Sequence, residues 1–475
     1  MAHRILKNAI ILSSTQVFSR ILSFTFFLIL ARYFGSEFFG KYYYVYTLIF
    51  LLTFISDLGL STLLIRDIAK LKERAGNILL HSVIIRIFFS VLVYSALVIT
   101  IYFQPDLDVD KKNLIYLLGF YVFSKALFEY SLNYFQGVEK QGIYGLLLLL
   151  NNILLVVITL FFIYGRTNFI IFSIIPVIAT LVSATVGFYL VNQQVSFKFK
   201  ILFGDLIFLI KRTIPFGLTL FVSAASARMG IIMISLLSTD IQVGQYGVAN
   251  RLIEGIMILP IIINKITYPL LSNLKNNPLK FQWTLETANK VLLLCTSVIV
   301  IVCNIYAEDI ITILFTNLYI DAVIVFQVLC WMLLGSFPNY IIGHALFSID
   351  KQREVLKISG LMLFINIYFN FILIPKFGII GVALTAVFTV AVTFIGYLRI
   401  LKQYYKIMDI FKNWVKITML CIIIVSVGLF LRSVIPEIVT ALCLISLYCF
   451  GIYFFKLISE QEITKFKLFL KQKGM

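Results

Sequence analysis

The sequence predicts an all-α integral membrane protein, and three observations lead to this fold class. Of the 475 residues, 61% are hydrophobic and 13% are charged, whereas a soluble domain has roughly 45–50% apolar and about 25% charged residues. The mean hydropathy is +1.00. Apolar windows near the ~20 residues that a helix needs to cross a bilayer recur along the whole chain, and none shows the alternation of a barrel strand. A soluble enzyme, a disordered protein and a disulfide scaffold are therefore excluded.

About fourteen transmembrane helices are predicted, separated by short polar breaks. Residues 1–8 are basic and precede an apolar run, as in a signal peptide. That run is too long for one, contains Gln16 and Arg20, and has no A-x-A cleavage site, so we expect it to stay in place as the first span. In chain order the windows are 9–31, 42–65, 79–103, 113–134, 143–164, 169–191, 213–237, 246–269, 289–305, 322–346, 358–374, 380–398, 414–431 and 438–456.

The orientation follows from the distribution of Lys and Arg, which accumulate on the cytoplasmic side of membrane proteins. With the N-terminus in the cytoplasm, the inside segments carry 27 of the 40 Lys and Arg residues, the outside segments carry 7, and 6 lie within windows. Both termini are therefore expected to be cytoplasmic, in the plasma (inner) membrane. Most of the net charge of +18 reflects topology. A nucleic-acid-binding patch is disfavoured because the cations are scattered over eight short loops.

A weak internal duplication predicts the domain organisation. A G-x-Y triplet opens both the second and the eighth windows, and a Gly/Asn pair recurs in the fifth and the eleventh. Repeats of six helices would insert the same way up, as in several transporter folds. The expected parts are an N-lobe at 1–212, a C-lobe at 213–400, and a last helix pair with a basic cytoplasmic tail at 401–475.

Nine ionisable residues lie inside the predicted spans, where a charge costs roughly 2.5–3.5 kcal/mol and usually faces the bundle interior or a wet cavity. Six are cations and three are acids, an excess that predicts a water-filled cavity receiving an anion. Arginine suits phosphate oxygens best. The candidate binding residues are Arg20, Arg228, Lys125, Arg251, Arg86 and Lys265; the acids are Asp57, Glu129 and Glu254.

Structural interpretations remain open for several of these residues. Lys125 and Glu129 are four residues apart on one helix, while Arg251 and Glu254 are three apart, so each pair can neutralise itself. Arg86 and Lys265 lie near the ends of their spans, where long side chains can reach the membrane surface.

No catalytic or metal-binding pattern stands out. The six cysteines all fall within spans, without metal-ligand spacing, and the three histidines are far apart. No triad, phosphate-binding glycine loop or HExxH is present, and no large extracytoplasmic segment interrupts the spans. We therefore expect neither enzymatic activity nor a cofactor.

The sequence resembles the polysaccharide transporter, or O-antigen flippase, branch of the multidrug/oligosaccharidyl-lipid/polysaccharide (MOP) exporter superfamily. The resemblance follows the whole chain in order. One departure is Val382, where alanine is usual. Three stretches carry the resemblance, namely residues 31–42 (ARYFGSEFFGKY, preceded by Ser19-Arg20), 243–251 (VGQYGVANR) and 374–383 (IPKFGIIGVA).

The resemblance implies two six-helix lobes in a V around a central cavity, with the last two helices beside them. It also implies export of polyprenyl-diphosphate-linked oligosaccharides by alternating access. Expected partners are this lipid-linked glycan, membrane lipids and polysaccharide polymerase or assembly proteins. H⁺ or Na⁺ coupling would use the in-span carboxylates Asp57, Glu129 and Glu254.

Three alternatives to this function remain. A multidrug cation antiporter and a peptidoglycan-precursor flippase belong to the same superfamily. A membrane glycan polymerase or ligase would act on the same lipid-linked substrates but belongs to a different class of protein.

Overall fold

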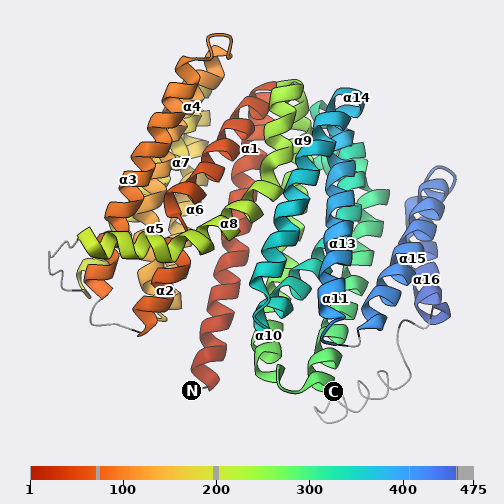
Figure 1. The fold of residues 1–475 in the computed structure, drawn as a ribbon. Coiled ribbons are helices and arrows are strands. Elements are labelled where there is room, and N and C mark those ends of the chain that lie inside the picture. The colour runs from red at the N-terminus through yellow and green to blue at the C-terminus, as the bar shows by residue number, and fades with distance from the viewer. Residues whose placement is uncertain (1, 71–74, 196–202, 406, 456, 458–475) are drawn as a thin grey trace. The chain divides into compact units, whose positions relative to one another are not determined.

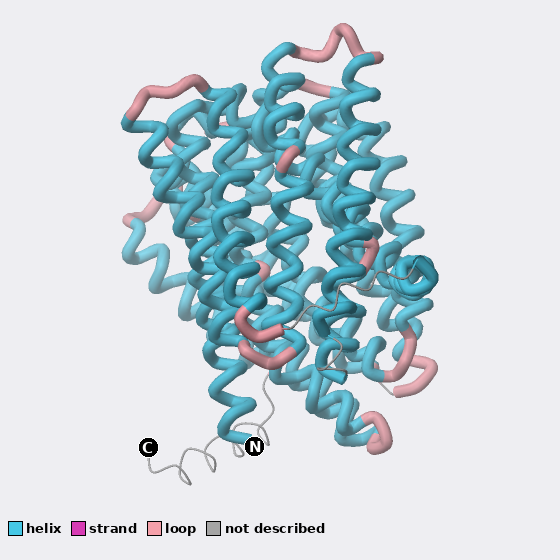
Figure 2. Tube along the Cα trace, turned by 90° about the vertical axis from the view of Figure 1, so that its left-hand side faces the viewer, coloured by secondary structure: helices cyan, strands magenta, loops and turns pink. Residues whose placement is uncertain are grey.

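The part of the chain that the structure describes consists of helices joined by loops and turns (Figure 2). Ten helices in this part are long and apolar enough to cross a membrane, and each of the fourteen predicted windows is mostly helical. The predicted all-α membrane fold is therefore confirmed. The basic tail expected after the last span lies outside the described residues. The computed structural model describes residues 2–70, 75–195, 203–405, 407–455 and 457.

Two predicted loops are only single-glycine breaks in long helices. Helix α1 (Ala2–Asp57) contains the first predicted loop, 32–41, and departs from helical geometry at Gly35, with φ 77°. Helix α14 (Gln352–Leu401) likewise departs from helical geometry at Gly378, with φ 56°. Glycine adopts this left-handed backbone without a Cβ penalty. The break gives α1 two arms (Figure 1). The arms pack together through Phe27 and Tyr43, whose ring centroids are 5.9 Å apart.

The chain forms two compact units, and the first comprises Met1–Ile258, Ile311–Val325 and Ser359–Thr385. Within it α5 packs extensively on α7, and α1 packs on α6, α8 and α9. The N-terminal part of α8 lies crosswise to α3 and α5 (Figure 1). Besides α1, its helices are α2 (Leu60–Lys70), α3 (Ala75–Tyr102), α4 (Val109–Gly119), α5 (Tyr121–Gly137), α6 (Gln141–Tyr164), η2 (Phe169–Ile174), α7 (Ile175–Asn192), α8 (Phe203–Leu237) and α9 (Asp240–Ile256).

The second unit comprises Leu259–Ile310, Phe326–Ile358 and Ala386–Met475. Within it α11 packs on α15, which packs on α16. An ion pair of 2.5 Å joins Arg432 to Asp309. The predicted loop at 306–321 contains short helices instead. The remaining helices of the chain are α10 (Ile258–Leu274), α11 (Pro278–Ile305), α12 (Ala307–Phe315), η3 (Asn317–Tyr319), α13 (Ala322–Ser348), α15 (Met408–Arg432) and α16 (Glu437–Phe454).

Helices α1 and α9 meet at a contact that we call the glycine seam, formed by Gly40 and Gly244. A Cβ on Gly40 would overlap the carbonyl oxygen of Asp240, and a Cβ on Gly244 would overlap that of Ser36. The two backbones therefore touch directly, and glycine is required at both positions because of space. Both glycines belong to the stretches that carry the family resemblance.

Ion pairs join the α3–α4 loop and α4 to the helices beside this seam. Lys41 Nζ lies 3.0 Å from Asp108 and 3.2 Å from Asp110, and Lys111 Nζ lies 2.6 Å from Asp240. Burial favours the protonated acid, but hydrogen bonds from Lys41 and from the Lys111 backbone N–H lower the pKa of Asp108 below its usual value.

Candidate functional site

An aromatic stripe on the second arm of α1 positions the charged groups of the site. Tyr42, Tyr46, Phe50 and Phe54 are spaced by four residues, so they share one face of the helix. Successive ring centroids are 6.4, 6.1 and 5.5 Å apart. Two groups of charged side chains lie against this stripe. Both groups belong to the first unit.

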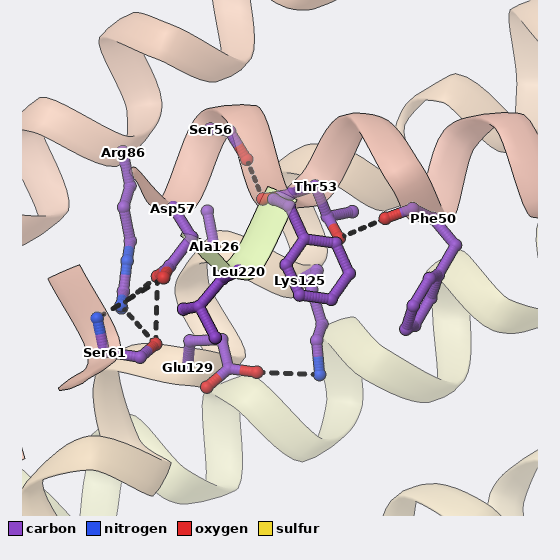
Figure 3. Close-up of a pocket in the computed structure, with 11 residues that line it drawn as sticks. Phe50, Thr53, Ser56, Asp57, Ser61, Arg86, Lys125, Ala126, Glu129 and Leu220 are labelled. Carbon is purple, nitrogen blue, oxygen red and sulfur yellow. Dashed lines mark hydrogen bonds and ion pairs between the residues drawn. The ribbon is translucent and has the colours of Figure 1, made fainter. Parts of the chain in front are cut away.

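The first group lines a cavity of about 260 Å³ with charged groups in mostly apolar walls, formed by α1, α2, α3, α5 and α8 (Figure 3). Hydroxyl, carboxylate, ammonium and guanidinium groups face the same space as aromatic and aliphatic side chains. The lining residues are Phe50, Thr53, Phe54, Ser56, Asp57, Ser61, Arg86, Lys125, Ala126, Glu129 and Leu220.

The charges of the cavity are matched in two ion pairs. Arg86 Nη2 lies 2.5 Å from Asp57 Oδ1, and Lys125 Nζ lies 2.8 Å from Glu129 Oε1. Arg86 also donates to the Ser61 hydroxyl over 2.8 Å, and Ser61 in turn donates to Asp57 over 2.9 Å. With two cations and two carboxylates, the cavity has no formal net charge.

Arg86 nevertheless has unused hydrogen-bonding capacity. Only 1% of the residue is exposed, and its Nε and Nη1 atoms have no hydrogen-bond partner within the described part of the chain. A buried donor that stays unpaired costs about 1–3 kcal/mol, and more when charged. These two nitrogens therefore favour an acceptor in the cavity, such as water or a ligand oxygen.

The second group, the arginine cluster, gathers Arg20, Arg228 and Arg251 around Glu254. Arg251 Nη1 lies 2.8 Å and Arg228 Nη1 3.7 Å from the Glu254 carboxylate. Arg20 Nη1 donates to the Glu254 backbone carbonyl over 3.4 Å. Two guanidinium groups thus face the carboxylate of Glu254 and a third binds its backbone carbonyl, which leaves a formal excess of two positive charges.

Aromatic rings hold two of these guanidinium groups. The guanidinium carbon of Arg251 is 3.5 Å from the Phe27 ring centroid, and that of Arg228 is 4.3 Å from the Phe50 centroid. Such cation–π contacts stabilise partly desolvated cations. Buried nitrogens of both arginines lack hydrogen-bond partners among the described residues, namely Arg251 Nε and Nη2 and Arg228 Nη1.

The structure divides the predicted binding residues into separate groups. Arg20, Arg228 and Arg251 come together around Glu254, whereas Arg86 and Lys125 line the neutral cavity. Phe50 belongs to both groups, because it lines the cavity and carries Arg228 on its ring.

The alternatives that the sequence left open have different outcomes. Both local ion pairs are present, Lys125 with Glu129 and Arg251 with Glu254. Arg86 is buried against Asp57 and does not reach toward a membrane surface. Lys265 lies on α10, half-buried in the second unit.

Sequence reasoning missed three parts of the site. Ser61 and Asn133 extend the Arg86 network, since Asn133 donates to Ser61 over 3.2 Å. Phe50 connects the two groups. The four-residue spacing of aromatic residues from Tyr42 to Phe54 was a visible signal for Phe50, whereas a lone serine and a lone asparagine carry none.

The many long apolar helices define the class of this protein, a multi-pass membrane protein. The chain belongs to the polysaccharide biosynthesis protein family, whose model matches residues 5–275. An uncharacterised membrane protein of Methanocaldococcus jannaschii is 22% identical over 443 residues, 87% of each chain.

Several solved structures of membrane transport proteins share the fold. The lipid II flippase MurJ, in an inward closed conformation, has a TM-score of 0.74 at 18% identity, covering 94% of this chain and 99% of that one. An inward-facing multidrug resistance MATE transporter has a TM-score of 0.66 at 17% identity, with 84% and 100% covered. A MOP superfamily transporter from Pyrococcus furiosus has a TM-score of 0.61 at 16% identity, and the match covers 84% of this chain and 97% of that one.

Among the described residues, no three His, Cys, Asp or Glu side chains gather in a way that suits a metal ion.

Proposed function

We propose that the protein moves a polyprenyl-diphosphate-linked oligosaccharide, such as an O-antigen or other surface polysaccharide repeat unit, from the inner to the outer leaflet. The observation that carries this proposal is the arginine cluster. Three guanidinium groups with an excess of two positive charges and unpartnered N–H groups suit a diphosphate, whose oxygens accept paired hydrogen bonds from arginine. Family membership supports a role in handling polysaccharide.

The mechanism is alternating access. The diphosphate and sugars would enter from the cytoplasmic side while the polyprenyl tail stays in lipid, and movement of the predicted N-lobe (1–212) against the C-lobe (213–400) would open the site outward. The protein would lie in the plasma membrane with both termini cytoplasmic. It would receive its substrate from membrane enzymes that build the glycan and deliver it to polymerase or assembly proteins.

An H⁺ or Na⁺ gradient would drive the cycle, without a cofactor. Asp57, Glu129 and Glu254 each have a cation within 2.8 Å. A coupling ion would have to compete with that cation for the carboxylate. Coupling would therefore require the ion pair to break during the conformational change.

A peptidoglycan-precursor flippase is the second candidate. The observation that favours it is the fit to the MurJ structure, with a TM-score of 0.74 compared with 0.66 for the inward-facing MATE transporter. A multidrug cation antiporter fits less well, because an excess of two positive charges at the arginine cluster repels a cationic drug. A polymerase or ligase would need a catalytic group, and the site offers only ion pairs and arginines.

Transport into proteoliposomes tests the proposal. The probe is undecaprenyl-diphosphate-N-acetylglucosamine, and its arrival in the opposite leaflet is measured by lectin accessibility. Arg20→Ala and Arg228→Ala should each reduce the initial rate at least tenfold, because each removes a charge that faces the diphosphate. Arg399→Ala is the matched control, since Arg399 is an exposed residue in the last turn of α14.

The proposal is wrong if Arg20→Ala and Arg228→Ala both transport the probe at the rate of the unaltered protein. Lipid II, tested in the same vesicles, separates the two candidates. Faster movement of lipid II than of the N-acetylglucosamine probe would favour the peptidoglycan-precursor flippase.

A further inference from the structure

The neutral cavity beside the arginine cluster has the chemistry of a sugar-binding pocket. Its carboxylates accept hydrogen bonds, and its Arg86 and Lys125 side chains donate them. The hydroxyls of Thr53 and Ser56 donate to backbone carbonyls and keep lone pairs that can accept. A sugar ring carries hydroxyls that donate and accept in every direction. A diphosphate only accepts, so it would leave the two carboxylates facing its own negative charge.

The unpartnered nitrogens of Arg86 supply a second, independent observation. The side chain is almost fully buried, and Asp57 and Ser61 use only its Nη2 atom. Its Nε and Nη1 lack partners within the described chain. Because the Asp57 ion pair already neutralises the charge, these donors suit neutral oxygens such as ring hydroxyls better than another anion.

Aromatic rings provide the apolar part of the pocket. Phe50 and Phe54 both line the cavity, with ring centroids 5.5 Å apart and planes inclined by 69°. Pockets for small ligands combine mostly apolar and aromatic walls with a few oriented polar groups. The C–H face of a pyranose packs against such a ring while its hydroxyls reach the polar wall.

The volume and the net charge of the cavity limit which ligands it can hold. Pockets for drug-sized ligands have volumes of about 300–1,000 Å³, so a cavity of about 260 Å³ suits one sugar ring. The two ion pairs leave no spare cation for an acidic sugar. We infer that this cavity is a subsite for a single neutral sugar ring of the lipid-linked glycan.

The shared residue Phe50 indicates which sugar this is. Phe50 lines the cavity and also contacts Arg228 through its ring. With a diphosphate at the arginine cluster, the sugar nearest to this ring would be the first one, which is attached to the diphosphate. The inference rests on the proposed function, because it takes the diphosphate to be the neighbouring group.

Binding of two probes to the purified full-length protein tests the inference. Undecaprenyl diphosphate carries only the phosphates, whereas undecaprenyl-diphosphate-N-acetylglucosamine adds one neutral sugar. The ratio of their dissociation constants gives the contribution of the sugar, which should be about tenfold or more. A third probe carries galacturonic acid in place of N-acetylglucosamine, and it should bind little or no more tightly than undecaprenyl diphosphate.

Two variants test the cavity itself. Arg86→Lys keeps a cation beside Asp57 but removes the unpartnered nitrogens, and Phe54→Leu removes an aromatic wall while leaving every charge in place. Each should reduce the contribution of the sugar to about threefold or less while leaving the affinity for undecaprenyl diphosphate unchanged. Phe88→Leu is the matched control, because Phe88 is 57% exposed on α3. If Arg86→Lys does not fold, Phe54→Leu still decides the question.

The outcomes separate this inference from the proposed function. If neither undecaprenyl diphosphate nor undecaprenyl-diphosphate-N-acetylglucosamine binds, the proposed function fails. If both bind equally well, the diphosphate proposal stands and the sugar subsite is wrong. The subsite is also wrong if the sugar still adds its full contribution to binding in both variants. It is wrong as well if the galacturonic acid probe binds as tightly as the N-acetylglucosamine probe.

Discussion

At the scale of single residues, Glu254 organises the arginine cluster. Its carboxylate lies near two guanidinium groups, and its backbone carbonyl accepts from a third. Asn250 donates to the same carboxylate over 3.3 Å. Without this carboxylate, three like charges would repel one another in a partly desolvated site. The residue therefore maintains the cluster while no anionic substrate is bound.

Glu254→Gln should destabilise the substrate-free protein and strengthen its response to an anion. Its side chain is 33% exposed, so we expect a loss of about 1–2 kcal/mol, less than for a fully buried pair. Pyrophosphate should restore more of the lost stability in this variant than it adds to the unaltered protein. The measurement is the melting temperature in detergent, with and without pyrophosphate.

Glu354→Gln is the control for this experiment. Glu354 is a more exposed carboxylate, 3.9 Å from Lys351, so neither the melting temperature nor the pyrophosphate effect should change. An equal pyrophosphate effect in Glu254→Gln and the unaltered protein would contradict the role assigned to Glu254.

At the scale of elements, the glycine seam fixes how α1 and α9 pack. Two helices whose backbones touch can carry no side chain at the point of contact, so the position along each helix is set by sterics. The neighbouring ion pairs from Lys41 and Lys111 then hold the α3–α4 loop and α4 against this contact. The glycine seam therefore fixes the position of α1, the two-armed helix that also carries the aromatic stripe.

Gly40→Ala and Gly244→Ala should each destabilise the protein, because the added methyl group overlaps backbone that cannot move aside. Overpacking of this kind costs about 1–3 kcal/mol, and occasionally more. Gly142→Ala is the matched control, since nothing lies within 4 Å of a Cβ at that position. The measurement is the melting temperature in detergent. A melting temperature equal to that of Gly142→Ala would show that the seam tolerates a side chain.

At the scale of the whole molecule, the distribution of Lys and Arg predicts the orientation in the membrane. A green fluorescent protein fused to the C-terminus should fluoresce, and alkaline phosphatase fused there should be inactive, because both termini are expected in the cytoplasm. A phosphatase fusion after Asp106, in the segment expected outside, should be active. The reverse pattern would contradict the orientation and the direction of transport.

Local physics made part of this structure predictable. A hydrocarbon core requires a long apolar helix wherever the chain crosses it, so each span can be identified from its own residues. The Lys125–Glu129 pair follows from spacing within one helix. A glycine such as Gly35 fits equally well in a loop or in a helix break, however, so the continuity of α1 could not be predicted.

The rest of the site depends on contacts between distant parts of the chain. Arg86 and Asp57 lie on different helices, and Arg20 meets Glu254 across 234 residues. No local pattern specifies these partners, so the sequence could indicate that the interior is cationic but not where the excess lies. Only the packing of α1 against α8 and α9 separates a neutral cavity from a charged cluster.

The glycine seam also has a consequence for how the protein is made. Gly40 is synthesised about 200 residues before Gly244, which at about 5–20 residues per second takes roughly 10–40 s. During that time the glycine face of α1 has no partner, because the helix that will cover it is still on the ribosome or in the translocon. The arginine cluster also waits for Glu254 on α9, so it can form only after that helix has been made.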